Sequence, residues 1–166
     1  MFLLSHERIV MSIKKIVAQT PTPQNAKFMY VWISLWCARS VLCAGAWLAL
    51  DNNQDQWIQA DLGTTLRIKS VITQGRPSSL YVQRVTSYYI SYSQDGTNWV
   101  DLPTLYSGNV DQYTKKANYL PANIDARFVR LRPQSWLHHI GLRFDVTGCA
   151  APSKFSSDRS VKAVSL

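Results

Sequence analysis

The sequence is short of charged residues. Of its 166 residues, 17% are charged and 46% are hydrophobic, a balance too apolar for a disordered chain. Aromatic residues make up 11%, which supplies enough bulky side chains for a core. The length is that of one domain with some excess at its ends. We therefore expect a single globular domain.

The common catalytic motifs are absent from the sequence. It contains no Gly-x-Ser-x-Gly elbow, no His-Glu-x-x-His zinc motif, no phosphate-binding loop and no dinucleotide fingerprint. Serine, histidine and aspartate occur, but their spacing indicates no catalytic triad. The adjacent His138 and His139 would point in opposite directions on an extended segment, so they cannot readily share a metal ion. We expect a protein that is not an enzyme and has no cofactor.

Cysteines are scarce, and their number is odd. The sequence has three, Cys37, Cys43 and Cys149. The gap between the first two does not match the short spacing of zinc knuckles. If the protein is secreted, a disulfide from Cys149 to either Cys37 or Cys43 would leave one thiol over. The alternative is three buried or free thiols.

Acidic residues are fewer than basic ones, but the excess is spread unevenly. The formal net charge is +8, of which +4 lies in residues 1–46, +2 in 47–149 and +2 in 150–166. A protein that binds nucleic acid concentrates positive charge on its folded face. Because the strand-rich part of this chain is only mildly basic, we expect no nucleic-acid partner.

Residues 1–43 differ in character from the rest of the chain. They show no sustained hydrophobic period, and Thr-Pro-Thr-Pro at 20–23 marks a break. Residues 28–50 form an apolar run long enough to span a bilayer, although Arg39 near its middle would cost about 2.5–3.5 kcal/mol. The preceding lysines and the small residues at 44–46 are typical of a signal peptide. An apolar strand or helix that packs on the domain fits equally well.

From Trp57 onward, an apolar–polar alternation with a period of two indicates β-strands. The predicted strands are 57–61, 66–75, 85–93, 98–100, 112–119, 126–132 and 142–147. Breaks or turns are predicted at Leu62-Gly63, Asp95-Gly96, Gly108-Asn109, Pro121 and Pro133. Proline ends a strand in this prediction because it cannot donate a hydrogen bond to its neighbour. Short strands at this spacing, without an amphipathic helix after Trp57, predict a β-sandwich or barrel.

Several conspicuous side chains in these strands have a structural interpretation. Alternation separates Arg127 from Arg130 and Arg132, so these arginines do not form a single anion-binding patch. Pairing with Asp61 or Asp145 would give structural roles to the arginines of this region, because a buried arginine needs a carboxylate partner. These arginines are Arg127, Arg130, Arg132 and Arg143. In strand 66–75, alternation predicts one face with Leu66, Ile68 and Ile72 and an opposite face with Arg67, Lys69, Val71 and Thr73. In strand 142–147, Leu142, Phe144 and Val146 alternate with Arg143, Asp145 and Thr147, which predicts a buried apolar face. Core anchors are predicted at Trp57, Trp99 and Trp136.

A series of short motifs follows in order along the chain. They are Gly45-Ala46-Trp47, QWIQADLG at 56–63, Thr73-Gln74-Gly75, YSQDG at 92–96 with Trp99, Gly108-Asn109, ARFVR at 126–130, PQSW at 133–136, IGLR at 140–143 and Gly148-Cys149. In this order and spacing they resemble the discoidin domain, also called the coagulation factor V/VIII type C domain. The resemblance covers residues 44–149, about two thirds of the chain.

This resemblance implies an all-β jelly-roll β-sandwich of the galactose-binding type, whose loops at one end bind ligands. Family members are extracellular recognition modules, not enzymes, so a secreted or cell-surface location is implied. The family's opening cysteine, first strand and first ligand loop have no counterpart in residues 1–43. This atypical segment is interpreted as a signal, an anchor or a replacement of the first strands. The tail at 150–166, rich in serine and lysine, is expected to be disordered.

The loop 76–84, which follows the Thr-Gln-Gly motif, is the first candidate ligand site. Its candidate residues are Arg76, Ser78, Ser79, Leu80, Tyr81 and Arg84. An apolar tip of Leu80 and Tyr81 flanked by arginines suits an anionic membrane surface. An aromatic ring beside arginine and hydroxyl groups equally suits a sugar. In the remaining alternative, Leu80 and Tyr81 fold back onto the sandwich.

The loop 51–56 is the second candidate. Its carboxylates and amides, including Asn52 and Asn53, suit sugar hydroxyls, a basic peptide end or Ca²⁺. The spacing does not match an EF-hand, so Ca²⁺ is not indicated. A solvated turn is the alternative.

We expect an adhesion module whose partner is a glycan, an anionic phospholipid or a cell-surface or matrix protein. Carbohydrate is preferred slightly, because Asn, Asp and Arg surround only a small apolar tip. The first alternative is binding to an anionic membrane surface through that tip. The second is a truncated structural fragment that binds nothing.

Overall fold

The computed structural model describes residues 45–151, together with the backbone of residues 9–10 and 15–18. Every regular element in these ranges is a β-strand. They are β1 (Ile9–Val10), β2 (Lys15–Ala18), β3 (Trp47–Leu48), β4 (Ile58–Gln74), β5 (Arg84–Ser93), β6 (Val100–Asp101), β7 (Tyr106–Ser107), β8 (Lys116–Leu137) and β9 (Gly141–Ala150). No helix capable of crossing a membrane occurs within the described ranges.

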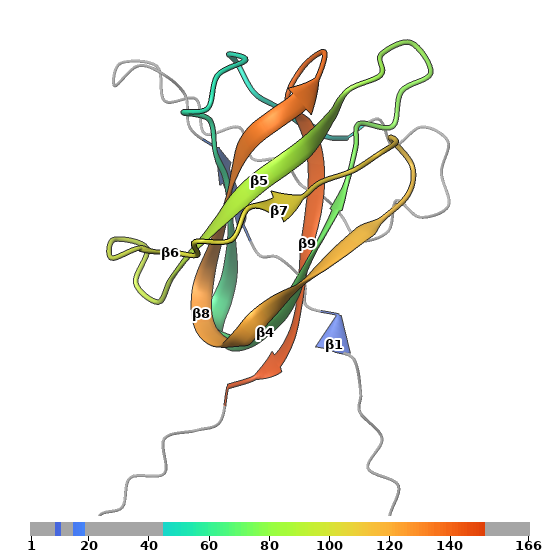
Figure 1. Cartoon of the computed structure of the whole chain (residues 1–166). Helices are drawn as coiled ribbons and strands as arrows, with labels where there is room; N and C mark the ends of the chain where they lie inside the picture. Colours follow the sequence, from blue (N-terminus) through green and yellow to red (C-terminus); the bar gives the residue numbers. More distant parts are fainter. Residues whose placement is uncertain (1–8, 11–14, 19–44, 152–166) are drawn as a thin grey trace, which may run out of the picture.

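The strands pair antiparallel in the order β1-β9-β4-β8-β5-β6, with β2 on β4, β3 on β9 and β7 on β5. The two longest strands, β4 and β8, pair with each other on both sides of a bend. Figure 1 shows this bend at the bottom of the molecule, where the sheet folds back over itself. The two layers thus share β4 and β8, and the predicted all-β sandwich is confirmed.

Neither predicted proline break occurs, because β8 runs through both Pro121 and Pro133. Both prolines lie where the pairing is irregular. Tyr88 of β5 lies opposite Pro133 directly after a register shift, and residues 120–123 fall within a shift in the pairing of β4 with β8. Pro121 has no ladder partner in the pairing of β8 with β4, so its missing N–H is tolerated. Pro133 is paired but adjoins a bulge, which is a position where proline is found within sheets.

The predicted break at Leu62-Gly63 is also a bend inside a strand. The pairing of β4 with β8 shifts register between Asp61 and Leu66, and Gly63 has φ of 79°. The backbone N–H of Gly63 donates to Asp61 Oδ1 at 2.8 Å. Glycine accepts this positive φ at little steric cost, so the strand turns from one layer into the other without ending.

A second bulge reverses the predicted faces of β4. Register shifts between Ile68 and Ser70 against both neighbouring strands. Ile68 is buried before the bulge, whereas Val71 and Thr73 are buried after it and Ile72 is only half-buried. The predicted face of Leu66, Ile68 and Ile72 is therefore wrong, because one extra residue moves all later side chains to the opposite face.

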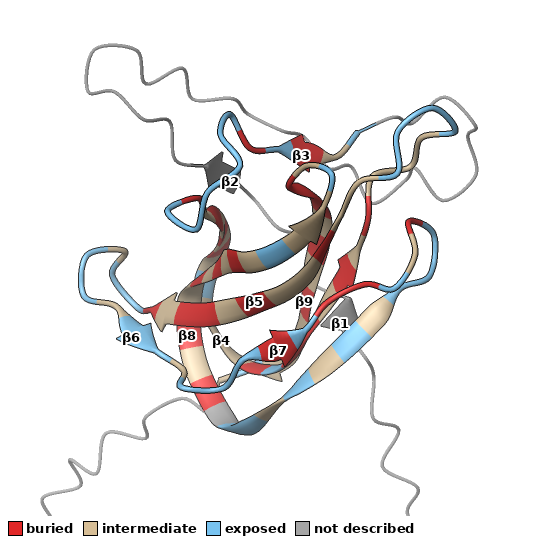
Figure 2. Cartoon of the chain, turned by 45° about the horizontal axis from the view of Figure 1, so that its top comes forward, coloured by how far each residue is buried: buried red, intermediate tan, exposed pale blue. Residues whose placement is uncertain are grey.

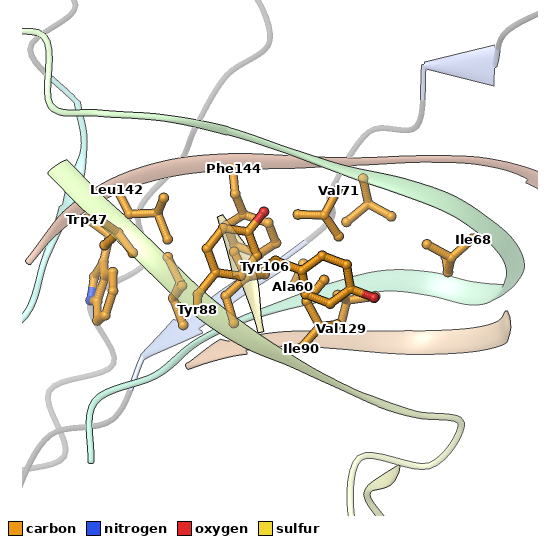
Figure 3. Close-up of a cluster of buried hydrophobic side chains, with 14 of the residues drawn as sticks. Trp47, Ala60, Ile68, Val71, Tyr88, Ile90, Tyr106, Val129, Leu142 and Phe144 are labelled. Atoms are coloured by element: carbon orange, nitrogen blue, oxygen red, sulfur yellow. The ribbon is translucent and has the colours of Figure 1, made fainter. Parts of the chain in front are cut away.

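The core lies between the layers and draws on every long strand. Figure 3 shows Tyr88 and Ile90 of β5 facing Leu142 and Phe144 of β9 across the interior. These four side chains are at most 4% exposed. The predicted alternation in β9 is confirmed, since Leu142, Phe144 and Val146 are all buried. Figure 2 shows that exposed residues concentrate in the connections between strands.

Two of the three predicted tryptophan anchors do not belong to the core. Trp57 and Trp99 are half-buried on the outer side of the sheet, where the Arg130 guanidinium lies 4.1 Å from one ring centroid and 3.8 Å from the other. Trp136 packs against the core as predicted, and Trp47 is the tryptophan that is buried among the described residues, at 4% exposure. A flat cation stacks well on aromatic faces, which gives the outer tryptophans another partner.

Candidate ligand-binding loops

Several connections lie at one end of the sandwich. They are residues 49–57 before β4, 75–83 between β4 and β5, 108–115 between β7 and β8, and 138–140 between β8 and β9. Figure 1 shows three of these loops at the top of the molecule, with loop 108–115 beside loop 75–83. Both predicted candidate loops are therefore at the same end, as the resemblance implied.

The tip of loop 75–83 is apolar and points into solvent. The exposed fractions of Leu80, Tyr81 and Val82 are 83%, 52% and 43%. The alternative in which Leu80 folds back onto the sandwich is excluded by this exposure. Three consecutive exposed apolar side chains form a protruding surface rather than a scattered one.

This tip is ordered by hydrogen bonds within its own loop. Ser78 Oγ accepts from the backbone N–H groups of Leu80 and Tyr81 at 3.2 and 3.1 Å. At the stem, the backbone N–H of Arg76 donates to the Gln83 carbonyl at 3.0 Å and Arg76 Nη1 donates to Gln83 Oε1 at 2.7 Å. The Arg76 guanidinium also lies 4.8 Å from the centroid of the Tyr81 ring. The turn and stem together fix the direction of the tip.

A buried amide from the neighbouring loop holds the same segment. Gln112 is 7% exposed, and its Nε2 donates to the carbonyls of Arg76, Ser78 and Tyr81 at 3.0, 3.1 and 2.5 Å. Because this NH₂ group has two hydrogens, the three acceptors share them. Tyr113 Oη adds a hydrogen bond to the Ser78 carbonyl at 3.2 Å. Loop 108–115 therefore holds loop 75–83 in place through these hydrogen bonds.

Loop 108–115 is itself firmly held. The buried Asn109 donates from Nδ2 to the carbonyls of Thr73 and Thr114 at 3.1 and 2.9 Å. Asp111 Oδ1 accepts from the backbone N–H of Thr114 at 2.6 Å and from that of Tyr113 at 2.7 Å. These donors, chiefly Thr114 and with a smaller contribution from the charge of Arg84, lower the pKa of Asp111 below its ordinary value.

Arg143 of β9 connects this pair of loops to the sandwich. Its Nε donates to the Gly75 carbonyl at 2.9 Å, and its Nη2 donates to the Gln112 carbonyl at 3.2 Å. Burial lowers the pKa of Arg143 from its ordinary value. The prediction of a structural role holds for this arginine, although backbone carbonyls rather than a carboxylate receive its hydrogen bonds.

The predicted residues of loop 76–84 are only partly brought together. Ser78 contacts the backbone of Leu80 and Tyr81, and Arg76 packs on the Tyr81 ring. Ser79 is exposed beside them. Arg84 differs, because it begins β5 and its charge acts on Asp111 in the neighbouring loop. One of the two predicted flanking arginines thus lies at the tip, and the other lies at the base of the loops.

The predicted asparagines of the other loop form hydrogen bonds within the protein. Asn52 Nδ2 donates to the His138 carbonyl at 3.0 Å, and Asn52 Oδ1 accepts from the backbone N–H of Ile140 at 2.9 Å. Asn53 Oδ1 accepts from Asp55 N and from Gln56 Nε2 at 3.1 and 2.9 Å. Asn52 thereby supports the turn between β8 and β9, where His138 has φ of 58°.

An open groove of about 360 Å³ runs along one side of the apolar tip. It is lined by Leu80, Tyr81, Val82, Gln83 and His138. The adjacent His139 does not share this groove, because its Nε2–H donates to the Ala49 carbonyl at 2.9 Å. The two histidines have separate surroundings, as predicted from their adjacency.

Two further predictions concern metal binding and a disulfide bond. Within the described residues, no group of three or more His, Cys, Asp or Glu side chains is arranged to hold a metal ion. Cys149 is half-buried in β9, while its predicted partners Cys37 and Cys43 lie outside the described residues. The same holds for most of the atypical segment 1–43 and for all but the first two residues of the tail 150–166.

The sequence prediction missed Gln112 and its loop. Residues 112–119 were predicted as a strand, but β8 begins at Lys116, and residues 112–115 belong to loop 108–115. The predicted turn at Gly108-Asn109 was the feature of the sequence that could have indicated this loop. A Cβ on Gly108 would lie 2.3 Å from the Val85 carbonyl oxygen, so the loop starts in direct backbone contact with β5.

Comparison with known proteins agrees with this arrangement. The family model of the F5/8 type C domain matches residues 32–146. The chain belongs to the F5/8 type C domain family. Similar curated proteins include coagulation factor VIII of Canis lupus familiaris, which is 41% identical over 109 residues, and lactadherin of Bos taurus, which is 34% identical over 111 residues. Each alignment covers 63% of this chain, but only 5% of that factor VIII and 26% of that lactadherin.

Several solved structures share the fold. Discoidin II of Dictyostelium discoideum superposes with a TM-score of 0.61 at 24% identity, covering 85% of this chain and 58% of that one. The CpGH89CBM32-5 module of Clostridium perfringens, in complex with GalNAc-β-1,3-galactose, superposes with a TM-score of 0.57 at 17% identity, covering 82% and 94%. At these identities the similarity supports the jelly-roll fold. The ligand of this chain has to be inferred from the chain's own residues.

Proposed function

We propose that this F5/8 type C domain binds anionic phospholipid membranes through the tip of loop 75–83. The observation that supports this most directly is the 83% exposure of Leu80 on a loop that the buried Gln112 holds in place. A flexible loop would expose an apolar residue only transiently. A loop that is held by hydrogen bonds exposes such a residue permanently. This exposure has an unfavourable hydration free energy unless a partner covers the apolar side chain.

The apolar character of the tip suits the lipid interface. Leu80, Tyr81 and Val82 would leave water together when the tip enters the boundary between headgroups and acyl chains. Burial of an apolar side chain there contributes about 0.8 kcal/mol per CH₂ group. Because the Ser78 turn already orders the tip, little conformational entropy is lost on insertion.

A positive charge accompanies the tip. The guanidinium of Arg76 packs over Tyr81, so it travels with the apolar residues to the membrane surface. Arginine binds phosphate oxygens well, and each basic residue near an anionic leaflet contributes about 1 kcal/mol. Residues 47–149 carry a formal net charge of +2, so the folded part adds a mild general attraction to a negative surface.

The hydrogen bonds of the asparagines favour the membrane over the sugar. The preference for carbohydrate rested on polar groups around a small tip, but both oxygens of Asn52 and Asn53 accept hydrogen bonds from the protein itself. The exposed surface is correspondingly more apolar than the sequence suggested. On the basis of family membership, the proposal includes a secreted or cell-surface location and no catalytic activity. It also includes no nucleic-acid partner, because the strand-rich part is only mildly basic, and no metal cofactor.

Vesicle flotation with the full chain tests this function. We expect binding to vesicles of phosphatidylcholine with phosphatidylserine, weaker binding at high salt, and no change on adding EDTA. Leu80→Ser should weaken binding roughly tenfold or more, as expected for two to three CH₂ groups that no longer insert. Val100→Ser is the matched control, since Val100 is 51% exposed on β6, away from the loops. Equal binding by wild type and Leu80→Ser would refute the proposal.

A carbohydrate site is the second candidate, and the groove beside the tip favours it. Tyr81 offers a ring face, while Gln83 and His138 offer polar groups, in a space of about 360 Å³. Aromatic faces with a few polar groups suit a pyranose ring. Saturable heat of binding with galactose or N-acetylgalactosamine, lost in Tyr81→Ala, together with no vesicle binding, would support this site instead. A chain that lacks cooperative thermal unfolding would favour the truncated, non-binding fragment.

A further inference from the structure

We propose that loop 108–115 is a second membrane anchor, in which Val110 and Tyr113 enter the same interface as Leu80. This inference rests on the proposed function. Val110 is 78% exposed and Tyr113 is 60% exposed, and neither residue lies in a loop for which the sequence predicted a ligand role. Their loop contacts the loop that carries Leu80, so the apolar residues of both can meet one surface.

The two loops form one rigid unit. Gln112, between Val110 and the base of the loop, binds three carbonyls of loop 75–83, and Tyr113 Oη binds the Ser78 carbonyl at 3.2 Å. A Cβ added to Gly75 would lie 2.9 Å from the Cα of Gln112. Backbones that approach this closely leave no space for independent movement. The positions of Val110 and Leu80 are therefore coupled.

The exposure of Val110 is imposed by its neighbours. Asn109, directly before it, is 3% exposed and bonded to two backbone carbonyls. Gln112, two residues later, is 7% exposed, and Asp111 between them accepts two backbone N–H groups. With anchored residues on both sides, Val110 cannot turn its side chain inward. Val110 is therefore a permanently exposed aliphatic residue, as Leu80 is.

The chemistry of this loop fits an anionic bilayer. Val110 has no polar side-chain atom with which to recognise a sugar. Lys115 is exposed at the end of the same loop and adds positive charge to that of Arg76. The negative charge of the Asp111 carboxylate opposes this attraction, but that carboxylate accepts hydrogen bonds from two backbone N–H groups, and the charge of Arg84 partly offsets it. Two separate apolar points would also fix the tilt of the domain on the membrane, which one point cannot do.

Flotation of the full chain with phosphatidylserine-containing vesicles tests the second anchor. Val110→Leu adds one CH₂ group and should tighten binding about fourfold, whereas Val110→Ser should weaken it roughly tenfold. Val100→Leu and Val100→Ser are the matched controls, because the same changes on β6 should leave vesicle binding unchanged. The tightening variant keeps the test sharp even if the serine variant folds poorly.

The outcomes separate this inference from the proposed function. If wild type binds and Leu80→Ser weakens binding, but both Val110 variants bind like wild type, loop 108–115 does not insert and the function stands. If Val110→Leu tightens and Val110→Ser weakens binding, with the Val100 controls unchanged, the second anchor is supported. If wild type does not bind the vesicles at all, both proposals are overturned.

Discussion

The guanidinium of Arg127 and the carboxylate of Asp61 form two parallel hydrogen bonds, with Nε–Oδ1 at 2.8 Å and Nη2–Oδ2 at 2.9 Å. The pair joins β8 to β4 at the position where the pairing of these strands shifts register. The same Oδ1 atom accepts from the N–H of Gly63 at 2.8 Å. This ion pair therefore stabilises the bend by which the sheet folds into two layers, and it confirms the structural role predicted for Arg127.

Asp61→Asn should lower the midpoint of thermal unfolding by several degrees. The amide loses the charge that faces Arg127, while its oxygen can still accept from Gly63. Asp125→Asn is the comparison, because Asp125 forms a similar bidentate pair with Arg67 at 2.9 and 3.0 Å. The Asp125 side chain is 34% exposed and that of Asp61 is 16% exposed, so the Asp125 change should have the smaller effect. Circular dichroism melts would contradict the argument if the order were reversed.

Gly108→Ala should destabilise the fold by about 3 kcal/mol or more. The new methyl group would lie 2.3 Å from the Val85 carbonyl oxygen and 2.9 Å from the carbonyl carbon of Thr86, and neither backbone atom can move without disturbing β5. Gly45→Ala is the control, since nothing lies within 4 Å of its added methyl. Urea unfolding measures both changes. Wild-type stability of the Gly108→Ala protein would contradict the argument from this backbone contact.

Arg130→Lys should cost about 1–2 kcal/mol of unfolding free energy. A lysine ammonium cannot stack between Trp57 and Trp99 as the planar guanidinium does at 4.1 and 3.8 Å. Arg132→Lys is a milder counterpart, because Arg132 lies 6.0 Å from the Tyr89 ring centroid and forms an ion pair with Asp101 at 3.0 Å. Chemical denaturation followed by tryptophan fluorescence compares the two. Equal losses would argue against a special contribution from the stack.

Stability should fall as the pH is lowered below about 4. The pKa of Asp111 is lowered in the folded protein, chiefly by the backbone N–H of Thr114, and the pKa of Asp95 is lowered chiefly by that of Asn98. A carboxyl whose folded pKa is depressed stabilises the fold above its unfolded pKa, and this contribution is lost as the pH falls through the folded value. The raised pKa of the half-buried Asp145 opposes this trend.

Thermal melts at a series of pH values measure this dependence. Asp111→Asn should flatten it, because the amide oxygen can still accept from Tyr113 and Thr114 but does not titrate. If the variant loses stability on acidification as steeply as wild type does, Asp111 does not contribute to the acid sensitivity.

Strand alternation was enough to predict the fold but not the bulges. In β9, the period of two correctly identified Leu142, Phe144 and Val146 as core residues. In β4, the same rule placed Ile72 on one face with Leu66 and Ile68, because alternation does not reveal the extra residue at Lys69 in the pairing with β9. A bulge is created by the pairing of two strands, so the sequence of one strand alone does not contain it.

The candidate site was predictable in part. Leu80 and Tyr81 stand out as apolar residues in a loop, and the structure shows them exposed at its tip. Gln112 does not stand out, because a glutamine after a turn is typical of solvent-exposed loops. Its importance arises from carbonyl groups 31 to 36 residues earlier in the chain, a contact that only folding creates.

The sequence by itself determined the all-β class, the family and the end of the sandwich at which ligands are expected, because these depend on local period and on motifs in a fixed order. Only the tertiary structure decided that Asn52 supports the turn between β8 and β9 and that Asn53 supports its own loop. It also decided that the charge of Arg84 acts on Asp111 and that Gln112 holds the loop of Leu80 in place. Hydrogen bonds and burial join residues distant in the chain, and a side chain's role depends on which partners the fold brings within about 3 Å.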